Sequence, residues 1–254
     1  MIKHYLKVAF RNLIKYKTQS LVSIIGLAVG FTCFALSVLW IRYEMTYDNF
    51  HEGADRIYLV RAHYANEPGT SKFTPYPLMK YLQDKMPEIE AVTAFTAHYV
   101  KFRMEDTEQE IGMIAADSVF MNFFDIQLLK GTVNFLKCDG QEVAITKEFA
   151  KRLFSKEEDA LGKEVEVGRR VCKIGAIVSG WSNHSNIPYN ILAPARHSPQ
   201  WGSSNEQLLI RVRERTDIDA FRTKMSTVCI NDIEKESELS DLLITRMSAL
   251  RYSD

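Results

Sequence analysis

The longest apolar run of the chain lies near its amino terminus. From Leu21 to Ile41 the sequence has 21 residues without a charged side chain, and Lys17 and Arg42 flank this run. A helix of this length measures roughly 31 Å, which matches the hydrocarbon core of a bilayer. The pattern therefore predicts a transmembrane helix over residues 21–41.

A cleavable signal peptide is the alternative interpretation of the same run. The segment Ala35-Leu36-Ser37 resembles a small-residue cleavage site. However, apolar residues continue past this site to Ile41, and a patterned basic region precedes the run. The sequence therefore favours an uncleaved anchor.

The first 20 residues alternate apolar and basic positions with a helical period. Such a helix lies flat in the headgroup layer, with its apolar stripe toward the lipid. We predict a cytoplasmic interfacial amphipathic helix over residues 1–20, and a basic helical flank is the simpler alternative. The stripe consists of Ile2, Leu6, Ala9, Phe10, Leu13 and Ile14, and beside it lie Lys3, Lys7, Arg11 and Lys15.

Small residues recur inside the predicted span at intervals of three and four. Helices associate in lipid through close backbone approach at small side chains, because no hydrophobic force drives them together. The stripe therefore predicts a helix-packing face, although glycine and serine are also common in membrane helices generally. Its members are Ser23, Gly26, Gly30, Cys33 and Ser37.

The remainder, residues 42–254, contains no second run of this length and predicts a mixed α+β extracytoplasmic domain. Strands and helices interleave without a regular βαβ rhythm, and halves around 74–116 and 147–212 suggest a two-lobed form. We expect strands over 56–64, 91–104, 110–115, 142–145, 164–167, 171–178 and 207–212, and helices over 77–86, 117–124, 147–154 and 217–231.

The amino-acid composition is consistent with a folded domain that has one membrane span. The 254 residues are 46% hydrophobic and carry 32 basic and 32 acidic side chains, which excludes a disordered tail and a basic nucleic-acid binder. A mean hydropathy of −0.17 excludes a polytopic membrane protein but allows one span.

The charges are unevenly distributed along the chain. Residues 1–43 hold six bases and no acid, which leaves 26 bases against 32 acids in the rest, a net charge of −6. Five cations precede the span, and Glu44, Asp48 and Asp55 follow it. The positive-inside rule therefore predicts a cytoplasmic amino terminus and an extracytoplasmic body.

Motifs for catalysis, cofactors and metals are missing from the sequence. His51-Glu52 lacks the second histidine of a zinc motif, and neither a nucleophile elbow nor a phosphate loop occurs. His184 lies in a polar loop that reads more simply as a solvated turn. We expect no catalytic, cofactor-binding or metal-binding residues, and no enzyme.

The cysteines do not form a disulfide framework. Cys33 lies in the predicted span, and Cys138, Cys172 and Cys229 lie outside it without a CxxC pair. One bridge among these three and buried apolar cysteines both remain open.

Several motifs resemble the MacB/FtsX-type ABC transporter permeases, in the version found in Bacteroidetes-like bacteria. The most specific stretch follows the span, and weaker matches extend the resemblance over roughly residues 8–215. The carrying residues are Arg11-Asn12-Leu13, Gly26-Leu27-Ala28-Val29-Gly30, Tyr47-Asp48, Phe50-His51 and Ala54-Asp55-Arg56-Ile57-Tyr58, then Phe123-Phe124-Asp125 with Gly131, Leu161-Gly162-Lys163 and the loop Asn183–Pro188.

The resemblance implies a permease subunit of the cell inner membrane, with residues 42–254 as a MacB-like periplasmic core domain. Implied partners are an ABC ATPase subunit, other permease helices or a second permease copy, the lipid bilayer and a periplasmic adaptor protein. Three further helices follow the core domain in such permeases, so the sequence, which ends at Asp254, is expected to be truncated before them.

The residues of the strongest motif also have a direct structural interpretation. Asp48 can cap a turn, Asp55 and Arg56 can pair locally, and apolar members can pack where the span enters the body. The predicted role is to couple the span to the domain, in export or mechanotransmission. A single-pass anchored binding or sensor module is the alternative. The coupling residues are Tyr47, Asp48, Phe50, His51, Asp55, Arg56 and Tyr58.

Overall fold

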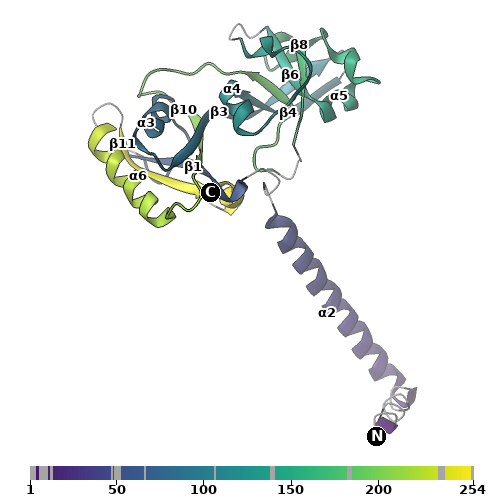
Figure 1. Ribbon diagram of the computed structural model, residues 1–254. Helices are drawn as coiled ribbons and strands as arrows, with labels where there is room; N and C mark the ends of the chain where they lie inside the picture. The colour runs from purple at the N-terminus through teal and green to yellow at the C-terminus, as the bar shows by residue number, and fades with distance from the viewer. Residues whose placement is uncertain are drawn as a thin grey trace. The chain divides into compact units, whose positions relative to one another are not determined.

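The computed structural model divides the chain into two compact units, Met1–Tyr47 and Asp48–Asp254, and each is described by itself (Figure 1). The structure describes residues 4–5, 11, 14–46, 48, 53–65, 67–105, 107–137, 141–181, 185–233 and 238–252, with backbone only for 228–233 and 251–252.

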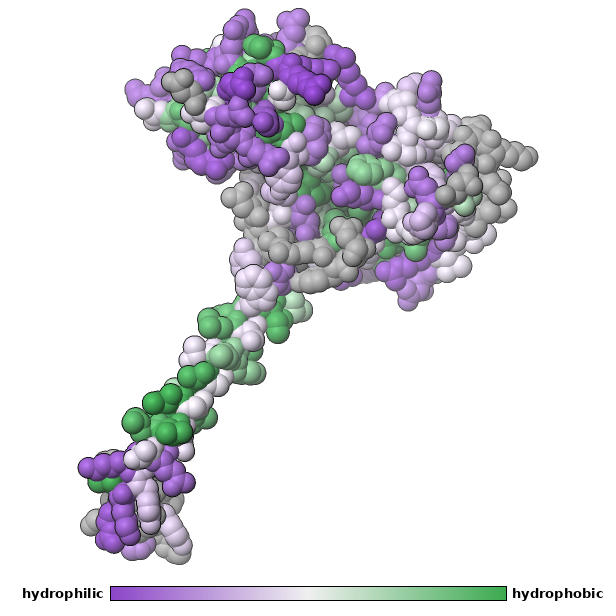
Figure 2. All heavy atoms as spheres, turned by 180° about the vertical axis from the view of Figure 1, so that it is seen from behind, coloured by the Kyte–Doolittle hydropathy of each residue, from purple (hydrophilic) through white to green (hydrophobic). Residues whose placement is uncertain are grey.

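The first unit contains the helix α2, Lys17–Glu44, which includes the predicted span. It is the one helix among the described residues that is long and apolar enough to cross a membrane, and Figure 2 shows hydrophobic side chains along much of it. The hydroxyls of Thr32 and Ser37 each donate to the carbonyl four residues earlier, at 2.8 Å. These bonds satisfy both hydroxyls inside the helix, as an apolar surrounding requires. Ten of residues 1–20 lie outside the described residues, and they include Ile2, Leu6, Ala9, Phe10 and Leu13 of the predicted stripe.

The second unit is built on one mixed sheet of 11 strands, and the α+β class is confirmed. Along the sheet the order is β11-β1-β10-β3-β4-β9-β6-β8-β5, with β2 beside β10 and β7 beside both β3 and β8. The strands are β1 Ile57–Tyr64, β2 Thr74–Pro75, β3 Ile89–Met104, β4 Thr107–Ala116, β5 Leu128–Gly131, β6 Glu142–Thr146, β7 Glu164–Val167, β8 Arg170–Val178, β9 Ile191–Pro194, β10 Ser204–Val212 and β11 Leu239–Arg246.

Short helices connect these strands. Asp117 caps α4 by accepting from the amides of Val119 and Phe120, and Thr146 caps α5 by accepting from the amide of Phe149, as Asp and Thr do at helix starts. The α-helices are α3 Pro77–Lys85, α4 Ser118–Phe123, α5 Lys147–Leu153 and α6 Ile218–Ile233, and the 3₁₀ helices are η1 Ala54–Arg56, η2 Val133–Leu136, η3 Glu157–Ala160 and η4 Met247–Tyr252.

The strands β11, β1, β10 and β3 form an antiparallel region that α3 and α6 cover. Successive side chains of β1 point to opposite faces. Tyr58 and Val60 face the helices, where Leu82 of α3 and Phe221 of α6 are buried with them. Leu59 faces the other side and a second core. Burial on both faces explains why the first four residues of β1, Ile57–Val60, are all apolar.

The strands β3, β4, β9, β6, β8 and β7 close into a ring, because β7 pairs with β8 and also with β3. Val165 lies opposite Cys172 of β8, and Val167 lies opposite Phe102 of β3. The interior of such a small barrel is filled by side chains. Phe102 is fully buried inside this ring, and Phe149 of α5 packs edge-on against it at 5.1 Å.

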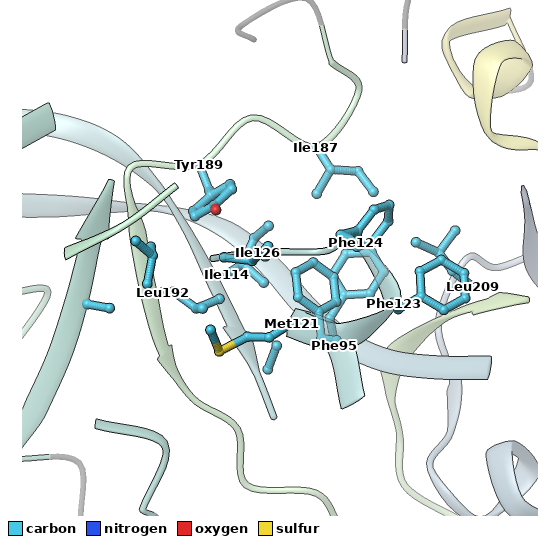
Figure 3. Close-up of a cluster of buried hydrophobic side chains, with 14 of the residues drawn as sticks. Phe95, Ile114, Met121, Phe123, Phe124, Ile126, Ile187, Tyr189, Leu192 and Leu209 are labelled. Atoms are coloured by element: carbon cyan, nitrogen blue, oxygen red, sulfur yellow. The ribbon is translucent and has the colours of Figure 1, made fainter. Parts of the chain in front are cut away.

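A third core, rich in aromatic residues, joins the ring to the antiparallel region (Figure 3). Phe120 lies 5.3 Å from Phe95 and 5.0 Å from Phe124, and Trp181 lies 5.1 Å from Phe124. Leu209 of β10 enters the same core. The unit therefore does not divide into the two sequential halves that the sequence suggested, because β10 returns from the second half to pair between β1 and β3.

We predict that Phe120→Ala destabilises the second unit by about 3–5 kcal/mol, because it removes a fully buried ring and leaves a cavity. Urea unfolding of the full chain in detergent micelles, followed by tryptophan fluorescence, measures this. Val119→Ala is the matched control on α4, since Val119 is 39% exposed, and its effect stays within about 0.5 kcal/mol. Equal effects of the two variants would contradict the packing described.

Candidate functional site

Asp48 is the first residue of the second unit, and it is fully buried. Its φ angle is +57°, a conformation that Asp and Asn tolerate better than most residues. The carboxylate accepts hydrogen bonds from the Ser185 hydroxyl at 2.5 Å, from the Asn186 side-chain amide at 2.7 Å and from the Asn186 backbone amide at 3.1 Å. These donors compensate for the loss of solvent around a buried carboxylate.

The loop that Asp48 holds connects β8 to β9. The Ser185 hydroxyl also accepts from the backbone amide of Ile187 at 3.1 Å. The Asn186 side-chain amide makes a further bond to the carbonyl of Met247 at 3.1 Å, and Met247 begins η4 directly after β11. Asp48, Ser185, Asn186 and Met247, here called the Asp48 cluster, thus join three distant segments of the chain. Asp48 therefore makes long-range hydrogen bonds, and its predicted turn-capping role stays a prediction.

Arg56 pairs across the sheet and not with its neighbour. Its guanidinium donates to Glu90 of β3 at 2.5 Å and to the carbonyl of Val212 at 3.0 Å. The hydrogen bond to Glu90 is the main cause that raises the pKa of Arg56. Asp55 is exposed and adds only a weaker electrostatic effect, so the expected local pair is not the principal contact of Arg56.

The structure does not bring the other predicted coupling residues together in one site. Tyr58 is buried in the core beneath α3 and α6, with the guanidinium of Arg246 5.9 Å from its ring centre. Tyr47, Phe50 and His51 lie outside the described residues. The predicted packing stripe from Ser23 to Ser37 lies on one uninterrupted helix, where Gly26 and Gly30 have open space around their α-carbons. Its packing role stays a prediction.

A second polar cluster surrounds His197, in the segment between β9 and β10. Its ring stacks on Tyr76 at 4.1 Å, and its nitrogens lie 3.2 Å from Glu206 and 3.8 Å from Asp117. Burial alone would lower the pKa of His197, but the two carboxylates outweigh it and raise that pKa to about 9. The histidine is therefore a cation at neutral pH that ties this segment to β10 and to the cap of α4.

The described residues offer few groups for other chemistry. No group of three or more His, Cys, Asp or Glu side chains among them could hold a metal ion. Neither Cys33 nor Cys172 is part of a disulfide. The side chains of Cys138 and Cys229 lie outside the described part, as does His184, so the question of a bridge stays open.

The fold and the Asp48 cluster define an α+β domain that directly follows, in sequence, a helix able to span a membrane. The family model of the MacB-like periplasmic core domain matches residues 20–228, so the chain belongs to that family. This match confirms the resemblance to the MacB/FtsX-type ABC transporter permeases.

Solved structures share the fold at low sequence identity. A domain assigned to a permease protein of Porphyromonas gingivalis has a TM-score of 0.61 and 20% identity, with 77% of this chain and 92% of that chain covered. The extracellular domain of the noncanonic ABC-type transporter YknZ from Gram-positive bacteria has a TM-score of 0.54 and 14% identity, with coverages of 74% and 99%. The periplasmic region of MacB from Actinobacillus actinomycetemcomitans has a TM-score of 0.54 and 13% identity, with coverages of 78% and 92%. No curated protein matches the sequence.

We predict that Asp48→Ala lowers the free energy of unfolding by about 2–4 kcal/mol, because buried donors on Ser185 and Asn186 lose a charged acceptor. Asp48→Asn keeps the backbone conformation and one acceptor oxygen, so it lowers the free energy of unfolding by less than Asp48→Ala does. Urea unfolding measures both, with exposed Asp55→Asn as the control, within about 0.5 kcal/mol of the parent. A parent-like Asp48→Ala variant would exclude a stabilising cluster.

The His197 cluster predicts a loss of stability at alkaline pH. Its folded pKa of about 9 lies above the ordinary value of 6.5, so the contribution is complete below pH 6.5 and disappears as the pH rises through 9. The contribution amounts to at most about 3 kcal/mol. Unfolding of the parent and of His197→Gln, compared from pH 6 to pH 10, should converge at the alkaline end. A constant difference between them across this range would contradict the ion pairs.

Proposed function

We propose that this chain is the amino-terminal part of an ABC transporter permease subunit. In this proposal the span connects a partner ATPase in the cytoplasm to the periplasmic core domain, which does conformational work in export or mechanotransmission. The observation that carries it is the Asp48 cluster, because it holds the first residue of the domain, four positions after α2 ends at Glu44.

A displacement of Asp48 has two defined routes into the domain. Along the chain, Ser185 and Asn186 are followed by Tyr189 and then by β9, a strand of the ring. Asn186 also contacts Met247, at the end of β11, and β11 pairs with β1 along most of its length. Movement of the chain at Asp48 would therefore reach the ring and the edge of the sheet together.

The membrane part of the proposal rests on sequence. Residues 1–20 would lie on the cytoplasmic surface and residues 21–41 would cross the inner membrane, with residues 42–254 in the periplasm. The small-residue stripe would pack against other permease helices or a second permease copy. A periplasmic adaptor is a further candidate partner, and hydrolysis would belong to the ATPase alone.

A single-pass anchored binding or sensor module is the second candidate. The same single apolar helix supports it, because an isolated anchor needs no partner helix. The two candidates differ in the role of the small-residue stripe of α2: a permease subunit needs it for helix packing, whereas a lone anchor does not.

We predict that Gly26→Leu/Gly30→Leu abolishes co-purification of the ABC ATPase subunit from native membranes, since the added side chains block close helix approach. Tagged full-length chain is purified in mild detergent, and the ATPase is identified and quantified by mass spectrometry. Ala28→Leu/Ala35→Leu is the matched control, because these positions lie on the opposite helix face.

The permease proposal expects the control to retain the ATPase and the glycine variant to lose it at equal membrane insertion. If the parent carries no ABC ATPase and no permease partner, the proposal fails. If the glycine variant and the control both retain the ATPase, the stripe is not the packing face.

A further inference from the structure

The ring of six strands has an open mouth at the end away from α5. A cavity of about 360 Å³ lies there, and every strand of the ring contributes to its wall. The interior beyond it is filled by Phe102 and its neighbours, so space for a ligand remains only at the mouth. The mouths of barrels are common places for small ligands, and this volume lies within the usual range of roughly 300–1,000 Å³.

The mouth has an apolar floor and a basic rim. The floor includes Met113 of β4, Val143 of β6 and Ala193 of β9, and the rim carries His98, Arg169, Arg170 and Arg196. No carboxylate is among the described lining residues. The cavity therefore combines an apolar floor with a rim whose ionisable side chains are all basic.

The arrangement of β7 and β8 directs the acidic side chain of Glu166 away from Arg169 and Arg170. Val165 and Val167 point inward, whereas Glu166 between them binds Arg103 on the outer face at 3.1 Å. Arg170 shares the inner face with Cys172, since side chains alternate along a strand, and it lies close enough to affect the thiol electrostatically. In the part of the chain that the structure describes, neither Arg169 nor Arg170 forms an ion pair.

We propose that the mouth of the ring binds a carboxylate that carries an aliphatic chain, of the kind found in a medium-chain fatty acid. The chain lies on the apolar floor, and the carboxylate pairs with Arg169 and Arg170, whose guanidinium groups match carboxylates in bidentate geometry. This site is separate from the Asp48 cluster and does not depend on the function proposed above.

Calorimetric titration of the full chain in nanodiscs of zwitterionic lipid tests this site, with the heats of empty discs subtracted. The probe is octanoate, and acetate and octylammonium are the matched ligands without the chain and with the opposite charge. We expect saturable binding of octanoate alone. If acetate binds as tightly as octanoate, the site recognises anions and not the aliphatic chain. If octylammonium binds as tightly, the site is an apolar hollow without charge selectivity. If octanoate does not bind, the proposed site does not exist.

Two variants locate the binding. Arg169→Gln/Arg170→Gln should weaken octanoate about tenfold or more, whereas Arg222→Gln on α6, where Arg222 pairs with Asp219, should leave it unchanged. Ala193→Trp should fill the mouth and abolish binding with the arginines intact. Octanoate should also slow maleimide modification of Cys172 in the folded parent, read by peptide mass spectrometry. Unchanged octanoate affinity in the double arginine variant would overturn the assignment, and thermal unfolding checks that each variant is folded.

Discussion

The second unit begins with a buried carboxylate, that of Asp48, and the contacts of this group constrain the rest of the unit. A buried carboxylate is costly unless donors surround it, and the donors to Asp48 come from Ser185 and Asn186, more than 130 positions along the chain. The entrance of the domain, the loop before β9 and the end of β11 are therefore fixed to one another. Each of these segments supplies hydrogen-bonding partners that help to hold the other two in position.

The long strand β3 imposes the second constraint. Its first half pairs with β10 and its second half pairs with β4 and β7, so one strand belongs to the antiparallel region and to the ring. The aromatic core around Phe120 fills the angle between them. Backbone hydrogen bonds of β3 therefore join the antiparallel region directly to the ring. This geometry suits a domain whose proposed role is mechanical.

The sequence predicts local features of this fold well. The uncharged run identified α2, and the expected ranges for α3, β3, β4, β7 and β8 agree with the observed elements to within a few residues. It missed β2, β5, β9 and β11. β2 and β9 have too few residues to show a period, and Leu128 and Leu129 of β5 are exposed. The motif around Asp48 could be recognised, but the partners of Asp48 and Arg56 could not, since Asn186 and Glu90 are distant in sequence and meet only after the sheet forms. The ring mouth was likewise invisible, because its walls come from six separate strands.

Hydrogen exchange of the full chain in nanodiscs tests most directly whether the Asp48 cluster joins the entrance of the domain to its distant segments. We expect Asp48→Ala to accelerate exchange of the Asn186 and Ile187 amides and of η4 by at least about tenfold more than exchange of the β6 amides in the ring, which follow the free energy of global unfolding. Asp55→Ala should change none of these. Unchanged exchange at Asn186, Ile187 and η4 in Asp48→Ala would show that the Asp48 cluster does not join these segments.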